Sequence, residues 1–198
     1  MKNLVLTASV LLLLASPAQA LQKKKSELIQ TEMHVTTTVD LGSMALDSPN
    51  RTLADYAKDY VDIPKGGVDW KTFGATKEIK VEGRAKDGYD FEYFKPGFSK
   101  EIKALDGKEV TLKGFMFPLD AANKQKMFLF GPFPVSCPFH YHVSPALVVE
   151  VHADKAPVGF SYDAITLKGK LQLVDKDPEN STFYRLVDAS MVKEDPKP

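Results

Sequence analysis

The sequence predicts a mainly β protein, with a small five-stranded OB-like antiparallel barrel that follows an N-terminal α/irregular extension. Two observations lead to this fold class. Five segments after residue 104 have the length and the polar–apolar alternation of strands with one solvated face. Gly114 and Gly169 lie inside two of these segments, where glycine marks a bulge or a sharp coil at which a small barrel closes. Such strands can also form a sandwich, and we favour the barrel.

The first residues have the pattern of a cleavable secretory signal peptide. Lys2 supplies a positive charge, residues 4–15 form an apolar run, and the segment ends in a small-residue pattern at Ala20. The run of about 12 residues is shorter than the roughly 20 that span a bilayer. We therefore expect export to the periplasm, cleavage after about Ala20, and no insertion of the mature chain into the membrane.

The rest of the chain divides into a tail, an extension and a barrel domain. Residues 21–50 are polar and are expected to form a mobile tail, although residues 33–41 could add a strand. Residues 51–100 form the extension, which has a short helix over 52–60 with Ser48 or Asn50 as its cap. The barrel domain is expected over residues 101–192.

Hydrophobic alternation places the individual strands and their buried faces. The extension has the residues for a strand over 78–83 and for a turn over 86–88. The five barrel strands are expected at 109–117, 127–133, 146–152, 165–174 and 182–189. The predicted barrel core contains Val110, Leu112, Leu129, Val149, Leu167, Leu171 and Val187.

Composition and charge exclude several classes of partner. The sequence has 26 basic and 26 acidic residues, and loss of Lys2 with the signal peptide leaves 25 against 26, a net charge near −1. This balance argues against nucleic acid and against electrostatic binding to a membrane. The sequence contains one Cys, so no internal disulfide can form, and stability must come from packing of the 43% hydrophobic residues.

One proline-rich segment carries side chains that bind metals. Cys137, His140 and His142 lie within six residues of one another. In an extended chain the two histidine rings project to the same side, and a turn at Pro138 would bring the thiol towards them. One thiolate and two imidazoles suit Zn(II), or copper, and suit the oxygen-preferring Mg²⁺ and Ca²⁺ poorly. We expect a metal site formed by Cys137, His140 and His142.

Several alternatives remain open at this site. Water, a substrate, a residue of a partner protein, Asp120 or Glu150 could supply a fourth ligand, and His34 and His152 are weaker candidates. Cys137 could instead be a small buried hydrophobe beside hydrogen-bonded histidines. Thiol chemistry at Cys137 is a minor possibility, since no resolving thiol or orienting group accompanies it. No catalytic residues are assigned, and an enzyme is not expected.

Residues 97–190 resemble a bacterial family of secreted, OB-like domains of unknown function. The resemblance is carried by the turn Leu105-Asp-Gly-Lys108, the strand end Gly114-Phe-Met-Phe-Pro-Leu119, the strand Met127-Phe-Leu-Phe130 and the proline-rich Cys–His loop. Family members commonly have Cys-x-His followed by several prolines, whereas this chain has Cys-x-x-His-x-His followed by Pro145. That difference leaves open which histidine is the family's equivalent. The resemblance implies a periplasmic accessory protein encoded near ABC-type transporter and zinc-supply genes.

We therefore expect a periplasmic metal-binding or metal-delivery accessory protein, with zinc as the first candidate and copper as the second. Its expected partners are the metal ion and a component of an ABC-type transporter in the inner membrane. The alternative is a non-enzymatic interaction module that docks on such a transporter through the proline-rich loop, with Cys137 in a structural role.

Overall fold

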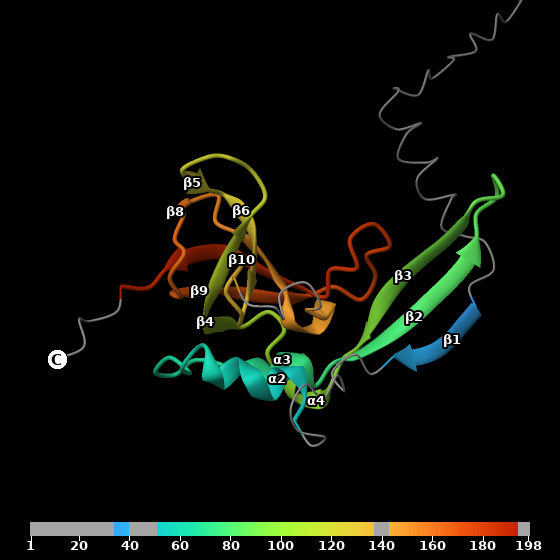
Figure 1. Cartoon of the computed structure of the whole chain (residues 1–198), viewed down its shortest axis with the longest axis horizontal. Helices are drawn as coiled ribbons and strands as arrows, with labels where there is room; N and C mark the ends of the chain where they lie inside the picture. The colour runs from blue at the N-terminus through green and yellow to red at the C-terminus, as the bar shows by residue number, and fades with distance from the viewer. Residues whose placement is uncertain (1–33, 40–50, 137–142, 194–198) are drawn as a thin grey trace, which may run out of the picture. The chain divides into compact units, whose positions relative to one another are not determined.

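The computed structural model describes residues 34–39, 51–136 and 143–193 (Figure 1). Contacts divide these residues into two units, one made of residues 83–91 and the other of residues 34–82 and 92–193. The first unit is the turn of a hairpin, in which Arg84 Nε lies 2.8 Å from Asp90 Oδ1 and Gly88 adopts a φ of +89°. The turn expected at residues 86–88 is present.

The second unit contains a closed five-stranded barrel, as the sequence predicts (Figure 1). The strand order around the barrel is β10-β7-β6-β4-β9. The pairings are antiparallel with the exception of β7 with β10, which is parallel. A parallel pair requires a long crossover connection, and the chain between these two strands includes β9. The strands are β4 (Glu109–Pro118), β6 (Met127–Gly131), β7 (Val149–His152), β9 (Ile165–Leu173) and β10 (Tyr184–Met191).

Each strand differs by one to three residues at an end from the sequence prediction, and the two largest consequences are at the proline-rich loop. β6 stops at Gly131, because Pro132 has no N–H to donate to the ladder. β7 begins at Val149, because the residues before it form the short 3₁₀ helix η4 (Pro145–Leu147). These two changes lengthen the connection that contains the proline-rich loop.

The barrel core agrees with the alternation of the sequence at five of its seven predicted positions. Val110, Leu112, Val149, Leu167 and Leu171 are buried. The prediction is wrong at Leu129 and Val187, which are partly exposed. Successive residues of a strand face opposite sides, and the inward positions are taken by Phe128 and Phe130 in β6 and by Leu186 in β10.

Gly114 and Gly169, the two glycines that the sequence analysis singled out, occupy places where a side chain has no room. The register of β10 shifts between Val187 and Ser190, opposite Lys170 and Lys168 of β9, so Gly169 faces a bulge. A Cβ on Gly169 would lie 2.9 Å from the Val187 carbonyl oxygen. The bulge that the sequence predicts at this glycine is confirmed.

Short helices of the extension pack onto the barrel core. The ring of Phe73 meets the ring of Tyr184 edge-on, with centroids 5.0 Å apart. The ring centroids of Trp70 and Phe130 are 6.1 Å apart. Thr52 is the residue before the first helix, and its backbone N–H donates to Asp55. The prediction of Ser48 or Asn50 as the cap is wrong, because the helix begins at Leu53 and Thr52 caps it. The helices are α2 (Leu53–Tyr56), the 3₁₀ helix η2 (Ala57–Asp59), α3 (Trp70–Gly74) and α4 (Lys100–Lys103).

Two further sheets complete the described residues. One has the order β1-β2-β3 and the other pairs β5 with β8. The strand expected over 78–83 lies within β2, and the strand that 33–41 could add is β1. No helix in the described part of the chain is long and apolar enough to cross a membrane. The strands are β1 (His34–Val39), β2 (Lys77–Arg84), β3 (Asp90–Gly97), β5 (Lys124–Gln125) and β8 (Val158–Gly159).

Candidate functional site: the frame of the Cys–His loop

The expected metal ligands Cys137, His140 and His142 lie outside the described residues. The structure describes the chain up to Ser136 and again from Val143. Among the residues that it describes, no group of three or more His, Cys, Asp or Glu side chains could hold a metal ion. The described residues on either side of this loop, which hold its two ends, form its frame.

The N-terminal end of the loop leaves the core at an aromatic contact. Phe133 is fully buried, and its ring meets that of Tyr60 edge-on, with centroids 5.3 Å apart and planes at 85°. Edge-to-face contact is a favourable arrangement for two aromatic rings. Two residues later Val135 is 45% exposed. The chain thus passes from core to surface over Pro134 and Val135.

The C-terminal end of the loop is fixed by Ser144. Its hydroxyl donates a hydrogen bond to the carboxylate of Glu78 and accepts one, 3.0 Å long, from the backbone N–H of Ala146. The second bond caps η4, where a serine side chain is a preferred partner for a free N–H. Ala146 and Leu147 are buried directly after it.

Ser144 belongs to a group of buried polar residues with Thr76, Glu78 and Tyr184. Their residual exposures are 6% for Ser144, 4% for Thr76 and 3% for Glu78, and Tyr184 is fully buried. The Tyr184 hydroxyl donates to the Phe73 carbonyl at 2.9 Å and lies 2.6 Å from Thr76 Oγ1. The group joins β2 and β10 to the end of the Cys–His loop.

Electrostatics keep the Tyr184 phenol neutral. Burial raises its pKa, the hydrogen bond with Thr76 lowers it, and the nearby charge of Glu78 raises it further. The balance lies well above the usual range, so Tyr184 acts as a hydrogen-bond donor rather than as a base or nucleophile. This arrangement gives no support to an acid–base function at the group.

His152 and Glu150, two weaker ligand candidates, pair with each other on the outer face of β7. His152 Nε2 lies 2.6 Å from Glu150 Oε1, and Arg185 Nε donates to the same oxygen at 2.7 Å. Burial by itself would raise the pKa of Glu150, but the hydrogen bonds from His152 and Arg185 outweigh it and lower the pKa. Glu150 is thus a charged residue engaged by two neighbours.

The remaining candidates contribute little to the frame. Asp120 Oδ1 accepts from the Ala122 N–H at 2.8 Å, the arrangement of a local turn. The backbone of His34 pairs with Glu82 in the β1–β2 ladder, and its side chain lies outside the description.

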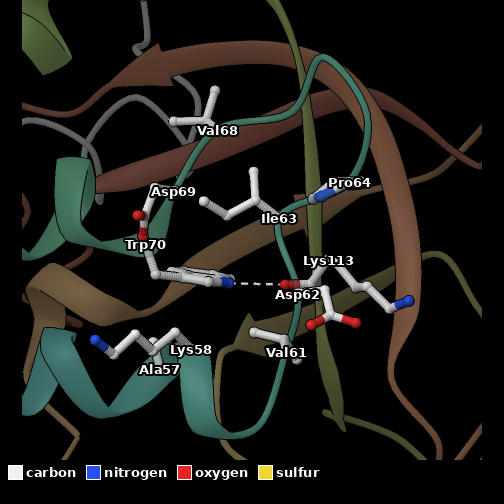
Figure 2. A pocket seen from close by; sticks show the side chains of 10 residues that line it. All are labelled: Ala57, Lys58, Val61, Asp62, Ile63, Pro64, Val68, Asp69, Trp70 and Lys113. Atoms are coloured by element: carbon white, nitrogen blue, oxygen red, sulfur yellow. Dashed lines mark hydrogen bonds between the residues drawn. The ribbon is translucent and has the colours of Figure 1, made fainter.

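A small hollow beside α3 is too small for a ligand (Figure 2). Trp70 forms part of its wall, and its indole N–H donates to the Lys113 carbonyl at 2.7 Å. The hollow has room for about one water molecule. Lys58, Asp62 and Asp69 also line it.

A family model described as a protein of unknown function (DUF3299) matches residues 73–193. The chain belongs to the DUF3299 family. This confirms the resemblance to a family of unknown function that the sequence motifs indicate. A search of curated proteins found no match.

The family match includes the buried polar group, the Cys–His loop and the five barrel strands. A solved structure, described as a DUF3299 family protein from Pseudomonas aeruginosa PAO1, is 22% identical to this chain. The alignment covers 51% of this chain and 70% of that one, with a TM-score of 0.37.

Sequence reasoning missed Glu78 and Ser144. In Lys77–Arg84 the apolar residues Ile79 and Val81 alternate with charged ones, yet Glu78 is as buried as the barrel core. Ser144 beside Pro145 reads as a turn residue, and its partner is 66 residues away. No local pattern in the sequence identifies either residue.

Proposed function

We propose that this protein is a periplasmic metal-binding or metal-delivery accessory protein that binds its metal through Cys137, His140 and His142, with zinc as the first candidate ion and copper as the second. The observation that carries the proposal is the set of three metal-type side chains within six residues of the sequence. The flanks of this set add support: Phe133 is buried with its ring against Tyr60, and Ser144 is buried with a hydrogen bond to Glu78.

Anchored flanks favour a binding loop over an unconstrained chain segment. Ordering a loop on binding has an entropic cost, which is reduced when its two ends are already fixed. Phe133 contacts Tyr60 at one end, and Ser144 contacts Glu78 at the other. Bonds of about 2.3 Å from zinc to sulfur and about 2.0–2.1 Å to each imidazole nitrogen are expected.

The fourth ligand follows from the surroundings of the described carboxylates. Glu150 is engaged by His152 and Arg185, and Asp120 closes a local turn. We therefore propose water, or a residue of a partner protein, in the fourth position. An open position of this kind suits exchange of the ion with a partner, whereas closed four-residue sites are structural.

Titration of Zn(II), and of Cu(I) under reducing conditions, into untagged mature protein tests the proposal. We expect Cys137→Ser and the double variant His140→Ala/His142→Ala each to lose at least about tenfold in affinity with the fold intact by circular dichroism. His152→Ala is the matched control, because it removes a histidine that pairs with Glu150 outside the loop. Equal binding by all four proteins would refute the proposal.

The proposed ligands also determine the pH dependence. Metal must displace protons from the imidazoles, whose ordinary pKa is about 6.5, so affinity should fall below about pH 6. Elemental analysis of protein taken from the periplasm without an affinity tag would identify the bound ion. The periplasmic location, the cleavage after about Ala20 and the OB-like nature of the barrel are parts of this proposal. The same fractionation tests the location and the cleavage.

The second candidate function is a module that docks on an ABC-type transporter component, with Cys137 packed as a structural residue. Two exposed apolar side chains favour it, since Val135 is 45% exposed and Tyr60 is 38% exposed at the start of the loop. In that case a Val135→Asp variant should lose binding to the purified transporter component, while Cys137→Ser should keep it. Metal binding that depends on Cys137 decides for the first candidate.

A further inference from the structure

Met127 of β6 and His152 of β7 are direct neighbours on the outer surface of the barrel. They lie opposite each other in the β6–β7 ladder, so their Cβ atoms are about 4.5–5.5 Å apart. The next pair in the same ladder, Phe128 and Val151, is fully buried, so alternation turns Met127 and His152 outward. Met127 is 45% exposed and the His152 side chain 29%. A thioether and an imidazole therefore lie side by side where solvent reaches both.

The ring of His152 is held from one side by Glu150. His152 Nε2 lies 2.6 Å from Glu150 Oε1, and Arg185 Nε donates to the same oxygen at 2.7 Å. Glu150 carries the negative charge that balances Arg185, and an ionised carboxylate can only accept hydrogen bonds. Nε2 of His152 therefore carries the ring proton, which leaves the lone pair of the neutral imidazole on Nδ1.

The two donor atoms are at the same height above the sheet. His152 Nδ1 and Met127 Sδ are each two bonds beyond their own Cβ atoms. Two donors joined to one ion by bonds of about 2.0–2.3 Å lie at most about 4.3 Å apart, which is close to the separation of the two Cβ atoms. The flexible side chain of methionine can take up the small difference. One ion can therefore bridge Sδ and Nδ1 without movement of the strands.

Neither side chain alone indicates a ligand, whereas the combination does. Single exposed apolar residues are normal on a protein surface, and a histidine beside a carboxylate can be purely structural. A histidine that binds a metal almost always donates its other ring N–H to a carboxylate, a backbone carbonyl or water, as His152 does to Glu150. A thioether beside it favours Cu(I), whereas Zn(II) is bound by thiolate, imidazole and carboxylate.

We infer that Met127 Sδ and His152 Nδ1 form a binding site for Cu(I) on the outer face of β6 and β7, with Glu150 orienting the imidazole. Cu(I) is stable with fewer ligands than the four-coordinate Zn(II), so the rest of its coordination is open to solvent or to a donor from another molecule. The residues of this site all belong to described strands. The inference goes beyond the proposed function and does not depend on the Cys–His loop.

Titration of Cu(I) under anaerobic, reducing conditions against a chromogenic chelator tests the inference. The protein is the mature chain carrying Cys137→Ser, His140→Ala and His142→Ala together, which removes the ligands of the proposed loop site. This parent should bind one Cu(I) ion per chain. Met127→Leu and His152→Ala, each added to it, should lose at least about tenfold in affinity. Leucine is close to methionine in volume, so circular dichroism of the Met127→Leu variant should be unchanged.

Met191→Leu is the matched control. Met191 is 53% exposed at the end of β10, and its ladder partner on β9 is Leu167 rather than a histidine. Met191→Leu should bind Cu(I) as its parent does. X-ray absorption at the copper edge should show a sulfur neighbour that is lost in Met127→Leu and kept in Met191→Leu. Equal binding by Met127→Leu and Met191→Leu would overturn the inference, because methionine would then bind copper without regard to His152.

The failure of the inference and that of the proposed function give different results. Because a thioether is not among the usual ligands of Zn(II), His152→Ala should keep the zinc affinity of the chain with its loop intact, and it remains the control for zinc at the loop. If the parent with the substituted loop binds no Cu(I), the inference is refuted whatever the loop does. If it binds Cu(I) through Met127 while zinc binding does not depend on Cys137, the proposed function fails and the inference stands.

A second measurement keeps the inference testable should the parent with the substituted loop fail to fold. Met127→Leu in the chain with its loop intact should then lower the Cu(I) capacity by one ion per chain, while Met191→Leu leaves the capacity unchanged. An unchanged capacity in Met127→Leu would refute the site.

Discussion

Substitution of Gly114 by alanine should destabilise the barrel through a backbone collision. A Cβ at this position of β4 would lie 2.5 Å from the carbonyl oxygen of Gly131 and 3.1 Å from ring atoms of Phe130. Gly131 is the partner of Phe115 in the β4–β6 ladder, so its oxygen belongs to the sheet backbone and cannot rotate away. The two strands must therefore move apart or distort.

The expected size of the effect follows from two opposing terms. Overpacking of a well-filled core costs about 1–3 kcal/mol, and a collision with backbone lies near the top of that range. Loss of the unfolded chain's extra freedom on replacing glycine contributes about 0.4–1 kcal/mol in the other direction. We expect Gly114→Ala to lower the free energy of unfolding by about 2 kcal/mol, which is a fall in Tm of about 4–8 °C for a chain of this size.

Gly159→Ala provides the control. Gly159 lies in β8, and nothing lies within 4 Å of the position where its Cβ would be built. The unfolded-state term then acts without a collision, and the variant should be equal in stability to wild type or more stable by up to about 1 kcal/mol. Urea unfolding followed by circular dichroism measures both. A Gly114→Ala variant within 0.5 kcal/mol of wild type, taken as about the error of the method, would refute the reasoning.

Two further predictions concern the extension. Trp70→Phe removes the indole N–H that donates to the Lys113 carbonyl and leaves a small cavity, so it should cost about 2–3 kcal/mol; far-ultraviolet circular dichroism must follow unfolding, because the sequence has one Trp. The pKa of Asp55 is lowered by hydrogen bonds from Lys71 and from Thr52. The stabilisation that its carboxylate provides is therefore complete above the unfolded pKa of about 3.9, and it is lost as pH falls from there through the lower pKa of the folded state. Asp55→Asn should therefore lower the free energy of unfolding by about 1 kcal/mol at pH 7, the size of a lost helix cap, and by progressively less below pH 4. A difference in urea midpoints that stays constant from pH 7 to pH 2 would contradict this.

Strand alternation predicts much of the barrel because a strand exposes one face and buries the other. In β4 and β9 the apolar residues occupy every second position, and Leu112 and Leu167 are fully buried as expected. The same rule fails in β6, where Phe128, Leu129 and Phe130 are all apolar and alternation has no contrast to use. The closure of the barrel then decides which of the three faces outward.

The metal-type residues of the candidate site are evident in the sequence because they lie within six positions of one another. The hydrogen bond that holds the C-terminal end of their loop is not evident in the sequence, since Glu78 and Ser144 are 66 residues apart and neither belongs to a recognisable motif. Apolar and charged residues alternate in β2, yet Glu78 is buried. Such contacts form when distant segments pack, and a local pattern contains no information about them.

The amino-acid sequence by itself determined the fold class, most strand positions, the glycines where side chains have no room, and the Cys-x-x-His-x-His segment. These features depend on local chemistry: side-chain period, the lack of an N–H in proline, and the ligand preferences of thiol and imidazole. The tertiary structure decided the parallel β7–β10 pairing and the burial of Glu78 against Ser144. Both arise when the barrel closes and brings together residues that the chain holds far apart, where the cost of burying a polar group is offset by a partner from another element.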